Sequence, residues 1–99
     1  MQIIWSRQAD DDLLQIWDYL ADQASIAIAD EQVRRIVVAS EQLSEWPQSG
    51  PLRDAIIPGM RSIVASPYVI FYRLHNDAVQ VVRVLHGRRD IEAVFAEES

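Results

Sequence analysis

The sequence contains no cysteine and no lysine, and each absence narrows the possible functions. Without cysteine, neither a disulfide framework nor a thiolate zinc site can form. The only two histidines, His75 and His86, stand well apart in the sequence, which argues against a dedicated transition-metal site. We therefore expect a protein without a bound metal and without a cofactor.

Long apolar runs are also missing. No stretch approaches the roughly 20 apolar residues of a membrane-spanning helix. The N-terminus, Met1–Trp5, lacks the charged head and long apolar segment of a signal peptide. With 99 residues, of which 49% are hydrophobic, the chain has the size and composition of one small globular domain, residues 1–99. We expect a soluble, cytoplasmic protein that does not bind membranes.

Positive charge is scarce and unevenly placed. The formal net charge is −6, and every one of the nine basic residues is arginine. The first 49 residues hold nine acids and three arginines, whereas residues 50–91 hold six arginines and three aspartates. Arginine suits planar, bidentate recognition of anions, although a coding bias could also explain its use. A chain of this net charge repels polyanions at long range, which disfavours direct binding to nucleic acid.

The first half of the chain has helical periodicity. Apolar residues recur at helical spacing from Ala9 to Ala24, and Ser6 is a suitable N-cap, so the pattern predicts an amphipathic helix over 7–23. Its aspartates, including Asp12, are expected on the opposite, solvated face. A second helical pattern covers 26–45 and ends at the proline- and glycine-containing segment that follows Trp46.

The second half has the character of β-strands. We expect strands at Arg61–Ala65, Tyr68–Leu74 and Val79–His86, joined by short turns as an antiparallel meander, and an opening strand at Ile3–Trp5. The order β-α-α-β-β-β predicts an α+β fold, in which an α-helical hairpin packs on one face of a curved antiparallel sheet. The segment 91–95 is expected to form either a short C-terminal helix or an added strand.

The most informative segment, Val82–Asp90, reads Val-Arg-Val-Leu-His-Gly-Arg-Arg-Asp. The end of an apolar strand there delivers His86, Arg88 and Arg89 at a glycine turn. We expect at least one of the two arginines to be exposed and to bind an anionic partner. The alternative is a surface ion pair with a following acid, worth roughly 0–1 kcal/mol. We interpret His86 as a hydrogen-bonding structural residue in preference to a proton-transfer group.

Three further arginines, Arg61, Arg73 and Arg83, lie on successive predicted strands. If their side chains share the sheet face away from the helices, they form a row that lines a concave binding surface. Otherwise they are ordinary solvated residues paired with acids. The sequence leaves both possibilities open.

The large apolar residues are expected either in the core or on a surface that binds a partner. Trp5 and Trp17 are expected mainly in the core, because large aromatic side chains dominate burial in small domains. Trp46 precedes a proline loop and is expected to be the most exposed of the three tryptophans. Other apolar side chains fall outside the helical stripes and are candidates for a groove that an amphipathic partner segment would cover: Leu14, Ile26 and Ile28.

Taken in order, these features resemble the RelE/ParE superfamily of bacterial toxins from type II toxin–antitoxin systems. The resemblance spans residues 5–90 and ends on His-Gly-Arg-Arg-Asp, which looks like the ParE branch. The matching positions are Trp5, Ala9, Asp12, Leu13, Ile16, Tyr19, Leu43, Pro47, Gly50, Arg53, Gly59, Arg61, Tyr68, Ile70, Tyr72, His86, Gly87, Arg88, Arg89 and Asp90.

The resemblance to the ParE branch implies a toxin that inhibits DNA gyrase by binding it, without catalysis of its own. It also implies a cognate ParD-like antitoxin that forms a hetero-oligomer with the toxin through a segment that folds on binding. The residues expected to bind the target are Arg88, Arg89, His86, Arg83, Arg73, Arg61 and Phe95. Those expected to bind the antitoxin are Trp5, Leu14, Ile26, Ile28 and Trp46.

The RelE-like branch, which cleaves ribosome-bound mRNA, is the alternative. By resemblance, its strand arginine falls at Val64 and its late tyrosine at Phe95, which has no hydroxyl, while its lysines are missing altogether. The catalytic set therefore looks absent. A ribonuclease would have to use His86, Arg89, Arg61 and Arg83. A third possibility is a degenerate toxin that only binds its antitoxin.

Overall fold

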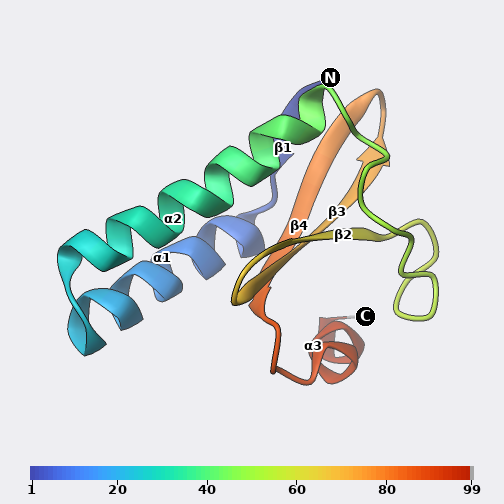
Figure 1. Cartoon of the computed structure of the whole chain (residues 1–99). Coiled ribbons are helices and arrows are strands. Elements are labelled where there is room, and N and C mark those ends of the chain that lie inside the picture. Colours follow the sequence, from blue (N-terminus) through green and yellow to red (C-terminus); the bar gives the residue numbers. More distant parts are fainter. Residues whose placement is uncertain (99) are drawn as a thin grey trace.

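The computed structural model describes residues 1–98 and has the expected α+β architecture (Figure 1). The elements follow in the order β1 (Gln2–Trp5), α1 (Arg7–Gln23), α2 (Ile26–Glu41), a 3-10 turn (Gln42–Ser44), β2 (Arg61–Ala65), β3 (Tyr68–His75), β4 (Ala78–His86) and α3 (Ile91–Glu98). The segment 91–95 thus belongs to a helix, which decides between the two expected alternatives. Within residues 1–98, no helix is both long and apolar enough to cross a membrane.

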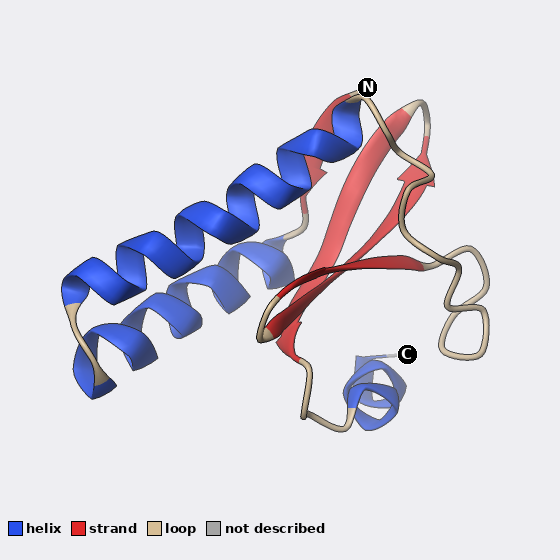
Figure 2. Ribbon diagram, viewed as in Figure 1, coloured by secondary structure: helices blue, strands red, loops and turns tan. Residues whose placement is uncertain are grey.

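The four strands form one sheet in the order β1-β4-β3-β2 (Figure 2). The three later strands make the predicted antiparallel meander, since β3 pairs antiparallel with both β2 and β4. β1, however, pairs parallel with β4, with Ile3 opposite Val79. The antiparallel meander is therefore confirmed, whereas the parallel place of β1 in the sheet was not predicted, because pairing between strands so far apart in the sequence leaves no local signal.

Both long helices begin at serine N-caps. Ser6 Oγ accepts a hydrogen bond from the Ala9 N–H at 3.0 Å, and Ser25 Oγ accepts one from the Ile28 N–H at 3.1 Å. Such caps satisfy backbone donors that have no partner within the helix. The predicted bounds of the first helix are confirmed. The second helix ends at Glu41 and continues only as a 3-10 turn, so it is shorter than the predicted 26–45.

Apolar side chains cover both faces of the sheet. On one face, Ile16 of α1 and Ile36 of α2 belong to the same buried cluster as Ile70 of β3. On the other face, Phe95 of α3 belongs to a cluster with Phe71 of β3. Neighbouring strand residues point to opposite faces, so Ile70 and Phe71 mark the two sides. In Figure 1 the α1–α2 hairpin and α3 accordingly lie on opposite sides of the sheet.

The three tryptophans differ in burial. Trp46 is 67% exposed, as expected from its place before a proline loop. Trp17, which was expected in the core, is only partly buried, and its indole N–H donates to Asp30 Oδ1 at 2.8 Å. Trp5 is also partly buried, at the end of β1.

Candidate functional site

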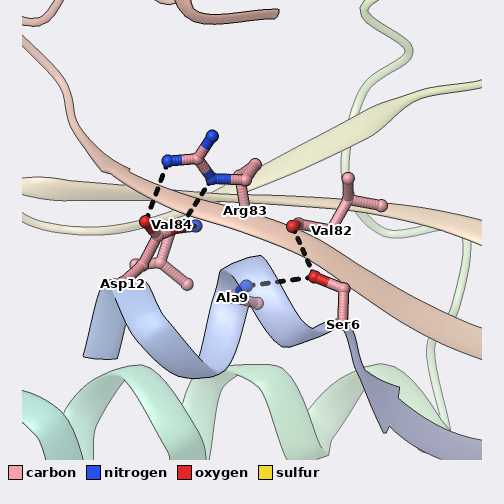
Figure 3. A network of polar contacts seen from close by, with 6 residues as sticks. All are labelled: Ser6, Ala9, Asp12, Val82, Arg83 and Val84. Carbon is pink, nitrogen blue, oxygen red and sulfur yellow. Dashed lines mark hydrogen bonds and ion pairs between the residues drawn. The ribbon is translucent and has the colours of Figure 1, made fainter. Parts of the chain in front are cut away.

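Beyond the end of β1, the N-terminal part of α1 and its capping residue form hydrogen bonds with the backbone of β4 in place of a neighbouring strand. Ser6 N donates to the Val81 carbonyl at 2.9 Å, and Ser6 Oγ donates to the Val82 carbonyl at 2.7 Å. Further along α1, Asp12 Oδ2 accepts the N–H of Val84 at 2.9 Å (Figure 3). Helix side chains thus satisfy backbone groups that a strand would otherwise pair, and they position the last residues of β4.

Asp12 also forms a bidentate ion pair with Arg83. The two contacts are Arg83 Nε to Asp12 Oδ2 at 2.8 Å and Arg83 NH2 to Asp12 Oδ1 at 2.9 Å. The arginine and aspartate side chains are only 11% and 7% exposed, respectively. The expectation that Asp12 lies on a solvated face is therefore wrong. A buried carboxylate is tolerated there because it receives three hydrogen bonds and a full opposite charge.

Backbone hydrogen bonds and the His86 side chain hold the turn that follows β4. Gly87 N donates to the Pro67 carbonyl at 2.9 Å, and Arg89 N donates to the His86 carbonyl at 3.0 Å. His86 Nδ1 accepts the Arg88 N–H at 3.1 Å, and its ring lies edge-on to Tyr68 with centroids 5.5 Å apart. His86 therefore makes the kind of structural hydrogen bond that the sequence suggested.

Arg88 and Arg89 are exposed at this turn, which we call the cationic tip (residues 86–89). Among the described residues, neither guanidinium group forms an ion pair. The acid that follows is used otherwise, since Asp90 Oδ1 accepts the Ala93 N–H at 3.1 Å at the start of α3. The tip thus presents two adjacent cations to solvent. The alternative, an ion pair between one of these arginines and a following acid, does not form among the described residues.

The other three arginines do not form the row that the sequence allowed. Arg61 faces Tyr72 across the β2–β3 pair and so shares its side of the sheet, whereas Arg73 follows Tyr72 and lies on the opposite side. Arg83 turns to α1, beside a register shift in the β3–β4 pair. Strand alternation and a β-bulge therefore separate these side chains, and the possibility of a shared face is wrong.

Each of these arginines also has an acceptor within the chain. Arg61 NH1 donates to the Gly50 carbonyl at 2.7 Å and so holds the loop after α2. Arg73 Nε donates to Gln80 Oε1 at 2.7 Å on the neighbouring strand. Arg73 is nevertheless exposed, so the predicted target surface is divided: Arg88 and Arg89 lie together at the cationic tip, and Arg73 lies apart from them on β3.

Phe95 does not contact solvent as the predicted target surface requires. Its side chain is 5% exposed, and its ring meets Phe71 edge-on at 5.2 Å. Phe95 therefore fastens α3 to the sheet. Arg53 also contributes on this side of the sheet, although no local pattern predicts a role for it: its guanidinium lies 5.5 Å from the centre of the Phe71 ring and donates to Ser62 Oγ at 3.0 Å.

The residues proposed for antitoxin binding are mostly exposed but scattered. Leu14 lies on α1, Ile26 and Ile28 lie in the first turn of α2, and Trp46 follows the far end of α2. A helix of 16 residues is roughly 24 Å long, so Ile26 and Trp46 are well separated. They do not line one groove.

A groove does form elsewhere, between α1 and the end of β4, and we call it the α1–β4 groove. It is an open cavity of about 400 Å³ that ends at the cationic tip. Burial raises the pKa of the Tyr68 hydroxyl, and nearby Tyr19 adds to this, so the neutral, hydrogen-bond-donating form of Tyr68 is favoured further. The lining residues are Asp12, Gln15, Ile16, Tyr19, Leu20, Pro67, Tyr68, Val84, Leu85, His86 and Arg89.

Only a weak signal in the sequence points to this groove. Gln15 and Tyr19 are four residues apart and therefore neighbours on one side of α1, next to the apolar stripe. The opposite wall comes from strands far along the chain, and no local pattern shows that it lies there. In the part of the chain that the structure describes, no cluster of His, Asp or Glu is arranged to hold a metal ion.

Comparison with known proteins assigns the family. Residues 3–91 match the family described as the ParE toxin of the type II toxin–antitoxin system parDE. The chain belongs to the ParE toxin family. Toxin ParE3 of Caulobacter vibrioides is 26% identical over 98 residues, which cover 99% of this chain and 98% of the relative. Toxin RelE2 of the same organism is 33% identical over 88 residues, covering 89% and 97% of the two chains.

A solved structure agrees with this assignment to the ParE family. The chromosomal ParDE toxin–antitoxin system from P. aeruginosa matches with a TM-score of 0.77 and 25% sequence identity. The match covers 87% of this chain and 95% of the other. The sequence therefore identifies the chain as a ParE-type toxin of a type II toxin–antitoxin system, and its fold matches that of the solved relative.

Proposed function

We propose that this ParE-family toxin inhibits DNA gyrase by binding it through the cationic tip. The observation that carries the proposal is the pair Arg88 and Arg89, two exposed guanidinium groups with no intramolecular ion pair among the described residues. In a chain of net charge −6, such a pair is a local attraction for an acidic surface. A toxin that acts on gyrase works in the cytoplasm, as one unit of residues 1–99.

The arrangement of the candidate catalytic residues favours binding over catalysis. General acid–base chemistry and charge stabilisation require side chains that are free to meet the reacting atoms. Arg83 is held by Asp12 in a nearly buried ion pair, and Arg61 is bonded to a loop carbonyl. Phe95 lacks a hydroxyl and is buried. His86 and Arg89 remain as the accessible pair.

A cognate, ParD-like antitoxin is the second part of the proposal. The solved relative is a ParDE system, and exposed apolar side chains are available for a partner: Leu14, Ile26, Ile28 and Trp46. Because these side chains lie apart, a partner segment that folds on binding would have to extend over the helical hairpin to bury several of them, and such burial would stabilise a hetero-oligomer.

The direct experiment is a supercoiling assay with purified gyrase and purified toxin. Toxin in molar excess should inhibit supercoiling, and a stoichiometric amount of the cognate antitoxin should restore it. Gyrase that works normally at a large excess of folded toxin would contradict the proposal.

A ribonuclease is the second candidate because RelE2 is 33% identical and because His86 and Arg89 both line one groove. Primer extension on cellular mRNA after toxin induction tests it. We expect no new cleavage ends. Ends that appear with the wild-type toxin and vanish with Arg89→Ala would replace the gyrase proposal with the ribonuclease.

A further inference from the structure

The α1–β4 groove has the size and lining of a binding site. Its floor is apolar, with Ile16 and Leu20 from α1 and Val84 from β4, and its volume of about 400 Å³ falls within the range of about 300–1,000 Å³ of ligand pockets. Tyr19 stands on one wall and is 61% exposed. Exposed tyrosines offer a large rigid surface together with a polar group, which is typical of protein interfaces.

The charges around the groove are asymmetric. Asp12 is the only acid in its lining, and the ion pair with Arg83 and the bond from Val84 N already satisfy that carboxylate. Arg89 lines the other end and has no ion pair within residues 1–98. The exposed acids of α1 do not line the groove: Asp10, Asp11, Asp18 and Asp22.

This asymmetry defines the chemistry of an occupant. An apolar side chain fits the floor, and a carboxylate close to it would bind Arg89 and receive hydrogen bonds from the tyrosine hydroxyls. The same carboxylate would be repelled by the acidic outer face of α1, so the charges also fix the direction in which the segment lies. The groove therefore selects a segment with a large apolar side chain and a carboxylate placed close to Arg89.

We propose that the antitoxin places one large apolar side chain in the α1–β4 groove and binds Arg89 with an adjacent carboxylate. Because the groove runs into the cationic tip, an occupant would cover His86 and Arg89 directly. Neutralisation then works by blocking the surface that meets the target. This inference rests on the antitoxin part of the proposed function and is independent of whether the target is gyrase.

Two matched glutamine substitutions on α1 test the inference. Gln8 and Gln15 are both exposed, and each becomes a negative charge when replaced by glutamate, but only Gln15 lines the groove. We expect Gln15→Glu to weaken the antitoxin affinity of the toxin about tenfold, since like charges across an interface are strongly unfavourable. Gln8→Glu should stay within about twofold, as a charge outside the contact mainly changes long-range attraction.

The measurement is isothermal titration calorimetry of each purified toxin variant with the cognate antitoxin. Tyr19→Ala, which removes an exposed ring and leaves the core intact, provides a second variant and should also weaken binding about tenfold, as an interface aromatic does. Circular dichroism melting curves should show that all three variants are folded.

Three results separate the possibilities. Wild-type affinity in both Gln15→Glu and Tyr19→Ala would overturn the groove as the antitoxin site. Normal antitoxin affinity combined with weaker gyrase inhibition would also overturn it, because the groove would then belong to the target. A toxin that does not inhibit gyrase but depends on Gln15 for antitoxin binding would refute the gyrase proposal and support the groove.

Discussion

At the scale of single residues, the burial and contacts of a side chain can depend on a partner far away in the sequence, and local sequence patterns then predict them wrongly. Helical periodicity puts Asp12 outside the apolar stripe of α1, and on that basis it should be solvated. Its actual partner is Arg83, which lies 71 residues further along the chain. Neither residue's neighbours in the sequence indicate this pairing, so the most strongly determined polar contact of the site could not be predicted from the sequence.

Replacing Asp12 with asparagine should destabilise the toxin strongly. The neutral amide of the Asp12→Asn variant cannot balance the charge of Arg83, and removing the carboxylate of a nearly buried ion pair costs about 3 kcal/mol of unfolding free energy. Asp11→Asn removes the same charge from the preceding, exposed position and should change the unfolding free energy by less than about 0.5 kcal/mol. Urea denaturation of both variants measures the difference; equal stabilities would refute the role given to the ion pair.

Tyr72 supplies a second residue-scale prediction. Its hydroxyl accepts the Gly50 N–H at 3.0 Å and donates to the Pro47 carbonyl at 2.9 Å, so it ties the loop after α2 to the sheet. Tyr72→Phe leaves a buried N–H without its partner and should lower the unfolding free energy by about 2 kcal/mol. Tyr19→Phe, on an exposed ring, should leave the melting temperature unchanged. A similar small effect of both substitutions would show that the loop does not depend on this hydroxyl.

At the scale of the elements, sequence patterns predicted what is local and missed what is not. The bounds of α1 and β2 follow from a capping serine, a clear period and a glycine turn, and they are confirmed. The parallel pairing of β1 with β4 and the bulge beside Arg83 depend on how distant segments meet. The same limitation hid the α1–β4 groove, one wall of which is a helix and the other the end of a strand.

The attachment of α3 is testable at this scale. Phe95 is the buried aromatic contact between α3 and the sheet. Phe95→Ala should lower the unfolding free energy by about 3 kcal/mol, the usual cost of removing a buried phenylalanine ring. Glu92→Ala, an exposed change on the same helix, should have a much smaller effect. Chemical denaturation followed by fluorescence compares them, and an unchanged midpoint for Phe95→Ala would mean that α3 is not packed on the sheet.

At the scale of the whole molecule, the toxin is acidic overall and carries two adjacent exposed arginines at the cationic tip. The first 49 residues carry most of the acids, whereas the paired arginines of the tip stand at the end of β4. This separation of charge would orient the toxin toward an acidic surface before contact and would accelerate association. The hydrogen bonds around His86 order the backbone of the turn, so on binding mainly the side chains of the two arginines have to be ordered.

The measurement that tests the central claim most directly is gyrase supercoiling inhibition by two charge-reversed toxins. Arg88→Glu with Arg89→Glu reverses the tip, and Arg34→Glu with Arg35→Glu reverses another exposed adjacent pair, on α2, with the same change in net charge. We predict that the tip variant loses inhibition at least about tenfold, as expected for like charges across an interface, and that the α2 variant retains it. Equal inhibition by both variants would contradict a binding surface at the tip.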